Sequence, residues 1–146
     1  GGNFYGYMGD MSRVFSIGKL PEQAYAAHQT CLETQEEIVA MAKPGTVCED
    51  MYNKAIEIVT KAGFADYFMG VDQKAKFIGH GIGLEINEMP VLAPRMKQEL
   101  EPGMVFALEP KIVLPGIGPV GIENSWAVTT DGLEKLTLCK EEIIEL

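Results

Sequence analysis

The stretch most informative about the fold is Gly79-His80-Gly81-Ile82-Gly83-Leu84-Glu85-Ile86-Asn87-Glu88-Met89-Pro90. It contains one of only two histidines in the chain, surrounded by glycines, and a proline closes it. Glycine lets the backbone take positive φ and lets other groups approach closely. Because the stretch lacks helical periodicity, we expect its histidine to be presented to another group rather than packed in a core.

The composition indicates one globular domain and excludes some partners. The chain has 146 residues, 47% of them hydrophobic, and a net charge of -9. This charge argues against nucleic acid as a partner; it suits cation binding, and solubility explains it equally well. No apolar run approaches the ~20 residues of a membrane span, and no signal peptide is visible. Three cysteines without a metal motif, Cys31, Cys48 and Cys139, favour reduced thiols and a cytoplasmic location.

The first half of the chain reads as strands followed by two helices. Residues 3–17 favour two strands around a turn, and an apolar helical pattern extends from Pro21 to residue 42. Lys43-Pro44-Gly45 interrupts this pattern. We expect Thr46 to cap the second helix in a capping box with Glu49, and Gly63 to end it.

The second half reads as strands and loops. The expected strands cover residues 104–108, 112–114, 121–129 and 133–138, and a loop covers residues 115–119. Strands, two helices and then antiparallel strands predict an α+β fold with helices covering one face of the sheet.

Three acidic residues lie where acids are poorly tolerated. Asp10 falls between strand segments, Glu109 follows an apolar strand, and Glu123 lies within a strand. Buried carboxylates are costly unless they are paired or bind metal. With His80 they form a set of three oxygen donors and one nitrogen donor, which suits Mn, Co, Fe or Zn.

Taken singly, each of these residues has an ordinary explanation. A glutamate at a strand end is usually a solvated edge residue, and a histidine in a glycine-rich loop is more often a local hydrogen-bond partner than a ligand. The sequence spacing alone does not bring the four together. Lys111, close to Glu109, is expected as a surface lysine, with electrostatic tuning of the site as the alternative.

A series of motifs in a fixed order resembles the pita-bread metallopeptidases, which include methionine aminopeptidases, Xaa-Pro aminopeptidases, Xaa-Pro dipeptidases and creatinase. The motifs are Gly-Tyr-Met-Gly-Asp10-Met-Ser-Arg, Lys43-Pro44-Gly45, Gly-His80-Gly-Ile-Gly-Leu-Glu, Phe-Ala-Leu-Glu109-Pro, Gly-Ile-Glu123-Asn and Val-Thr-Thr-Asp-Gly. The resemblance spans nearly the whole chain and implies a curved antiparallel sheet covered by helices.

The resemblance also implies roles for individual residues. Asp10, His80, Glu109 and Glu123 would be metal ligands, with Asp10 and Glu123 bridging two cations. A bridging hydroxide would attack the scissile carbonyl, and Glu109 would help move its proton. Glu109, His80 and Asn87 would be the catalytic residues.

The chain departs from this family pattern in three places. The other metal-binding Asp of the family is missing; if Gly1 is the glycine of its Asp-x-Gly step, that Asp lies two residues upstream. We therefore expect residues 1–146 to be the C-terminal, larger part of a catalytic domain truncated at its N-terminus, with two ions in the complete domain and one in this chain. Asn87 stands where the family usually has a second His, and Gly121 where Xaa-Pro enzymes often have an Arg.

The expected function is a metal-dependent exopeptidase that hydrolyses N-terminal peptide bonds, of the Xaa-Pro aminopeptidase or dipeptidase type. Its partner would be a peptide substrate, and the resemblance is compatible with a homodimer. Two alternatives stay open: a catalytically inactive protein-binding module, favoured by Asn87 and Gly121, and a creatinase-like hydrolase of a small C–N substrate.

Overall fold

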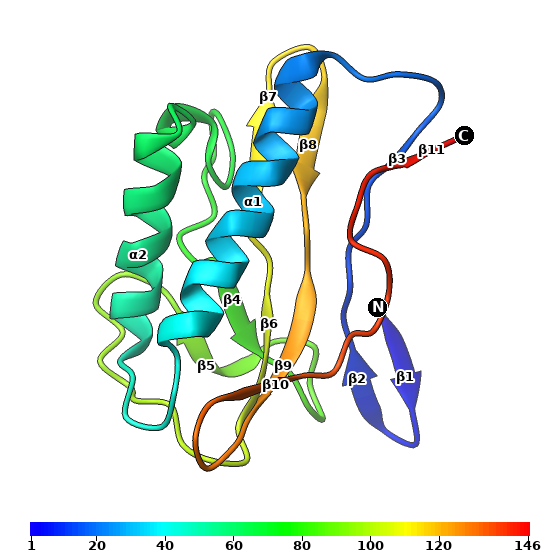
Figure 1. Cartoon of the computed structure of the whole chain (residues 1–146). Coiled ribbons are helices and arrows are strands. Elements are labelled where there is room, and N and C mark those ends of the chain that lie inside the picture. The colour runs from blue at the N-terminus through cyan, green and yellow to red at the C-terminus, as the bar shows by residue number, and fades with distance from the viewer.

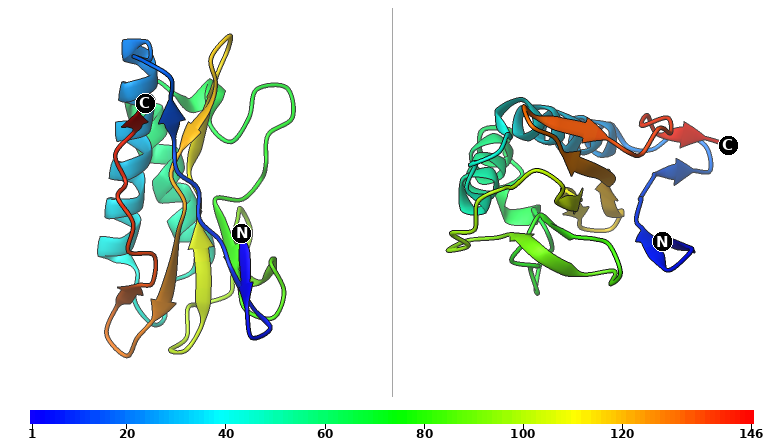
Figure 2. Two further views of the ribbon diagram at one scale, coloured as in Figure 1. Left: turned by 90° about the vertical axis from the view of Figure 1, so that its right-hand side faces the viewer. Right: turned by 90° about the horizontal axis from the view of Figure 1, so that it is seen from below.

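The computed structural model describes residues Gly1–Leu146 and places two helices on one face of a five-stranded antiparallel sheet (Figures 1 and 2). The helices are α1 (Glu22–Met41) and α2 (Cys48–Lys61), followed by the short helix η1 (Ala65–Tyr67). In spatial order the strands of the sheet are β10 (Leu133–Lys135), β9 (Asn124–Val128), β6 (Val105–Leu108), β4 (Gly79–Gly81) and β5 (Glu88–Leu92). The expected α+β class and the covered face are thus confirmed.

Three pairs of short strands form separate two-stranded sheets beside it. They are the hairpin β1 (Gly2–Phe4) with β2 (Tyr7–Gly9), the hairpin β7 (Lys111–Leu114) with β8 (Gly118–Gly121), and β3 (Phe15–Ser16) with β11 (Ile144–Glu145). Hairpin β1–β2 projects on the side of the molecule away from α2 (Figure 1). The parallel pairing of β11 with β3 brings the C-terminal segment back beside the N-terminal one.

Each helix buries one apolar stripe against the sheet. Helix α1 buries Ala24, Ala27, Cys31 and Ile38, which recur at spacings of three, four and seven residues. Helix α2 buries Met51, Ala55 and Val59 at spacings of four. These side chains join the inward-facing strand residues in one core, which also contains Phe106, Leu108 and Ile112. No helix of the structure combines the length and apolar character needed to cross a membrane.

Several local expectations were wrong. The strand expected at residues 133–138 ends at Lys135, and residues 3–17 contain parts of three short strands instead of two. The Thr46 side chain does not cap α2, because its hydroxyl bonds the Lys43 amide and the Met41 carbonyl instead. The loop expected at residues 115–119 is shorter, since β8 already begins at Gly118. The strand expected at residues 121–129 is interrupted, because Glu123 leaves the ladder and forms an isolated bridge with Ser12.

Candidate metal centre

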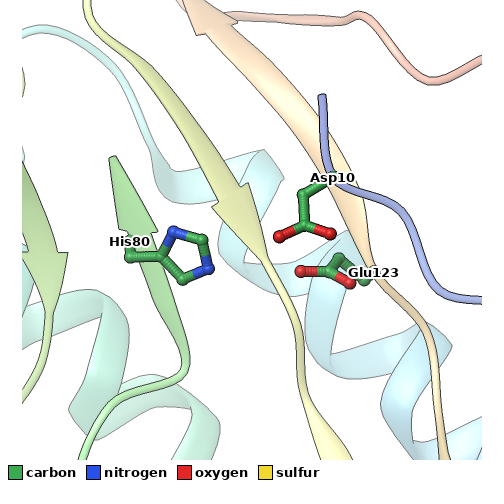
Figure 3. A group of neighbouring side chains, drawn as sticks. All are labelled: Asp10, His80 and Glu123. Carbon is green, nitrogen blue, oxygen red and sulfur yellow. The ribbon is translucent and has the colours of Figure 1, made fainter. Parts of the chain in front are cut away.

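The side chains of Asp10, His80 and Glu123 lie close together although they are far apart in the sequence. His80 follows Asp10 by 70 residues, and Glu123 follows His80 by 43. One ligand atom of each lies within 4.8 Å of those of the other two. Figure 3 shows the carboxylates of Asp10 and Glu123 side by side, with the imidazole of His80 directed toward them. His80 and Glu123 are buried and Asp10 is half-buried.

The backbone of β4 is packed so tightly that it fixes the histidine. Strand β4 lies between β5 and β6, and its residues are buried. A Cβ atom at Gly79 would collide with the Ala107 carbonyl, and one at Gly81 with the Met89 backbone. His80 Nδ1 lies 3.1 Å from the Gly81 carbonyl oxygen. A carbonyl can only accept, so this bond places the proton on Nδ1 and leaves Nε2 as a free lone-pair donor.

Glu123 is held by the segment that follows hairpin β1–β2. Its amide donates to the Ser12 carbonyl at 3.3 Å, and the Ser12 hydroxyl donates to its Oε2 at 2.6 Å. Burial raises the pKa of the Glu123 carboxyl, and the Asp10 and Glu109 carboxylates raise it further, while the Ser12 bond acts in the opposite direction. The excess of negative charge in this buried place is what a bound cation would relieve.

Asp10 reaches the site because its main chain is tied to β9. The Ser125 hydroxyl donates to the Asp10 carbonyl at 3.0 Å. This contact at Asp10 and the main-chain bridge between Ser12 and Glu123 together hold the segment that follows β2 against the sheet. A residue in an otherwise exposed segment is therefore placed beside buried ligands.

Glu109, the fourth expected ligand, lies next to this group of three but is not part of it. Its Oε1 is 3.6 Å from His80 Nε2, and its Oε2 is 2.5 Å from Lys111 Nζ. Lys111 is partly exposed, as expected of a surface lysine, but its contact with Glu109 favours the alternative of electrostatic tuning. Lys111 forms an ion pair with a side chain of the site.

Asn87 is exposed, and it lines the same hollow as His80. This hollow has a volume of about 310 Å³ and is also lined by Phe77, Glu88 and Met89. The Phe77 ring packs edge-on against the His80 ring, with centroids 6.1 Å apart. An amide side chain thus faces the space beside the histidine, where it could donate a hydrogen bond to a bound molecule.

A buried polar network behind the site was missed by the sequence analysis. Asn124 Nδ2 donates to Gln35 Oε1 of helix α1 at 2.8 Å, and Gln35 Nε2 donates to the Leu108 carbonyl at 2.5 Å. Asn124 follows Glu123, and Leu108 precedes Glu109, so the network joins the backbones of two candidate ligands. The available signal was the long polar side chain of Gln35 on the same helical face as the apolar Cys31 and Ile38.

Arg13 completes this network from the other side. Its guanidinium donates to the carbonyl of Glu123 at 2.9 Å, to Asn124 Oδ1 at 2.8 Å and to the Lys140 carbonyl at 2.6 Å. One side chain therefore joins the segment after β2, the start of β9 and the C-terminal segment. Nothing in the local sequence around Arg13 indicates these contacts.

The donor set is chemically suited to a divalent ion. It offers two carboxylates and an imidazole nitrogen at short mutual distances, with a third carboxylate beside the imidazole. Such a mixture binds Mn, Co, Fe or Zn, and it lacks the thiolates of softer sites. The two cysteines of the core, Cys31 and Cys48, are not in the group.

Comparison with known proteins agrees with this arrangement. The model of metallopeptidase family M24 matches residues 1–130. The Xaa-Pro dipeptidase of Pyrococcus furiosus is 33% identical over 138 residues, which cover 94% of this chain and 38% of that protein. The chain thus spans well under half the length of this relative.

Solved structures show the same similarity. The X-Pro aminopeptidase of Thermotoga maritima superposes with a TM-score of 0.88 at 31% identity, and the Xaa-Pro dipeptidase of Bacillus anthracis with 0.86 at 36%. Each comparison covers 97% of this chain and 38% of the other. The expected pita-bread fold is confirmed. The chain belongs to metallopeptidase family M24, a family of peptidases that use divalent metal ions.

Proposed function

We propose that the chain is the C-terminal, larger part of the catalytic domain of a metal-dependent exopeptidase. The reaction is hydrolysis of N-terminal peptide bonds, of the Xaa-Pro dipeptidase or aminopeptidase type. The observation that carries the proposal is the convergence of Asp10, His80 and Glu123 within 4.8 Å. The names of the similar proteins, Xaa-Pro dipeptidase and X-Pro aminopeptidase, support the substrate type.

In this proposal Asp10, His80, Glu109 and Glu123 hold the metal, with two ions in the complete domain and Mn, Co, Fe or Zn as candidates. When bound, the ions supply Lewis-acid polarisation of the scissile carbonyl and lower the pKa of a water molecule. The buried carboxylate of Glu123 and the free Nε2 lone pair of His80 are prepared for this task by the contacts of Ser12 and Gly81.

The residues of the chain have separate tasks around these ions. Glu109 lies 3.6 Å from His80 Nε2, which suits it to accept and pass on a proton at the reacting centre. Asn87 lines the hollow beside His80 and would donate an amide hydrogen bond to the substrate. Because an amide does not titrate, Asn87 orients the substrate and carries no proton.

The test uses the full-length parent protein, because the chain spans 38% of its similar proteins. The apoprotein is loaded with Mn²⁺ or Co²⁺, and the release of the N-terminal residue is measured with Xaa-Pro dipeptides, Xaa-Pro tripeptides and matched Xaa-Ala peptides. Elemental analysis after desalting gives the metal content. Glu123→Gln should remove both metal and activity, whereas Glu57→Gln on the exposed face of α2 should change neither.

The other outcomes separate the alternatives. Hydrolysis of creatine without hydrolysis of peptides would favour the creatinase-like function. Absence of retained metal in the parent protein would favour a binding module, for which the Lys111–Glu109 ion pair is a specific supporting observation, since it already supplies a cation to one candidate ligand. We further propose a cytoplasmic homodimer, which light scattering and cell fractionation would test.

A further inference from the structure

Glu109 is the candidate ligand whose carboxylate is paired with the ammonium of another side chain, that of Lys111. Lys111 Nζ lies 2.5 Å from its Oε2, while its Oε1 faces His80 Nε2 at 3.6 Å. The Glu109 side chain is 13% exposed and the Lys111 side chain 39%. A cation already occupies one oxygen of a largely buried carboxylate. Glu109 is also the one candidate ligand that does not join the group of three.

The backbone around Lys111 explains why this side chain can reach the site. Lys111 begins β7 and pairs across the hairpin with Gly121 of β8. A Cβ atom at Gly121 would lie 2.7 Å from the Lys111 Cβ and 2.6 Å from the Pro110 carbonyl oxygen, so the glycine leaves room for the lysine stem. A hollow of about 290 Å³, lined by Glu109, Lys111, Gly121 and Glu123 among others, lies directly beside the pair.

The ammonium of Lys111 and a divalent ion would compete for the same carboxylate. Asp10, Glu109 and Glu123 place three carboxylates around one histidine, and their mutual repulsion is partly relieved by the ammonium on Glu109. A divalent ion would relieve the same repulsion more strongly, but it needs the same carboxylate, and like charges at short distance repel. The long aliphatic stem of lysine and the adjacent hollow give the ammonium freedom to withdraw.

We propose that Lys111 is a positioning residue that competes with the divalent ion for Glu109. It holds Glu109 outside the group of three and stabilises the metal-free site, and thereby lowers the affinity for metal. The proposal rests on the proposed function in assigning Glu109 to the metal. A purely structural ion pair would only stabilise the protein. The role proposed for Lys111 requires in addition that its loss raises the affinity for metal while it lowers the stability of the metal-free protein.

The experiment compares wild type, Lys111→Met and Lys111→Arg in the full-length parent protein, after removal of metal with EDTA and its exchange into chelator-free buffer. Met keeps the aliphatic volume without the charge, and Arg keeps the charge. Isothermal titration with Mn²⁺ should give about 10-fold tighter binding for Lys111→Met, because the variant removes a positive charge that repels the ion at a partly solvated position. The melting temperature of the metal-free Lys111→Met protein should fall, and Lys111→Arg should stay close to wild type in both measurements.

Each other outcome counts against the proposal. Unchanged or weaker Mn²⁺ binding by Lys111→Met would overturn it, and weaker binding would show that Lys111 instead directs Glu109 toward the metal. A metal-free Lys111→Met protein at least as stable as wild type would also overturn it. If wild type itself bound no metal, the proposed metallopeptidase function would fail together with this inference, whereas the preceding outcomes leave that function intact.

Discussion

The hydroxyl of Ser12 donates a 2.6 Å hydrogen bond to Oε2 of Glu123, across 111 residues of sequence. The same two residues also form an isolated antiparallel bridge between their main chains. One oxygen of a buried carboxylate is thereby fixed, and the other is left for a ligand. This contact links the exposed segment after hairpin β1–β2 to the centre of the candidate site.

Loss of this hydroxyl should weaken metal binding. We expect Ser12→Ala to lower the affinity for Mn²⁺ by about 10-fold, because partners that orient metal ligands typically contribute at this level. Ser12→Thr keeps the hydroxyl and should bind like wild type. Titration calorimetry on the full-length parent protein measures the difference. Equal affinities for the Ala and Thr variants would show that Ser12 does not orient Glu123.

The network centred on Asn124 should contribute more to stability than to chemistry. Asn124→Leu would leave the Arg13 guanidinium and the Gln35 carbonyl oxygen without their buried partner. We expect a loss of about 3 kcal/mol in the free energy of unfolding, since the buried Gln35 oxygen loses its donor and the bonds of Asn124 to Arg13 and Glu141 are lost with it. Urea denaturation measures it, with Asn53→Leu on the exposed surface of α2 as control. A loss equal to that of the control would contradict this role.

His28 should make the protein less stable in mild acid. Burial within α1 lowers its pKa below the ordinary 6.5, and the nearby Arg13 lowers it further. The unfolded chain therefore binds the proton first, so stability falls as the pH drops below about 6.5 toward the lowered folded value. For a single titrating group, the free energy of unfolding changes by at most about 1.4 kcal/mol per pH unit.

The measurement for His28 is the urea midpoint at pH 7.5 and pH 5 in the presence of EDTA. His28→Leu removes the titrating group and should lose less stability than wild type over this interval. His80 is present in both proteins and cancels in the comparison. Parallel pH profiles for the two proteins would exclude a contribution of His28.

The three cysteines should react very differently. Burial raises the pKa of Cys31 to about 12 and that of Cys48 to about 11, so both stay protonated thiols at pH 8. The thiolate is the reactive form, and Cys139 is exposed. We expect one fast thiol per native chain with a disulfide reagent and three in urea. Cys139→Ser should abolish the fast phase, and a remaining fast thiol in this variant would contradict the assignment.

The elements with a strong periodic signal were predicted well. The expected first helix, from Pro21 to residue 42, differs from α1 by one residue at each end. Its apolar stripe and the break at Lys43-Pro44-Gly45 are local features that the sequence displays directly. Capping of α2 was predicted wrongly, because Thr46 had a competing hydrogen-bond partner in the Lys43 amide that the pattern alone did not rank.

The candidate ligands were found through motifs, and their environment was not. His80, Glu109 and Glu123 stood out from their glycine-rich or apolar neighbours. Ser12 and Lys111 looked like ordinary polar residues, because nothing local distinguishes a serine or lysine that touches a ligand from one that faces solvent. Their contacts span 111 residues in one case and depend on the β7–β8 hairpin in the other.

The sequence by itself determined the class of fold, the family resemblance and the types of donor atom, because periodicity, glycine positions and short motifs are local properties of the chain. Only the tertiary structure decided that Asp10, His80 and Glu123 meet within 4.8 Å while Glu109 is held by Lys111. Distances between residues from different strands depend on strand order and register. These follow from the packing of the whole sheet against α1 and α2, which no local pattern encodes.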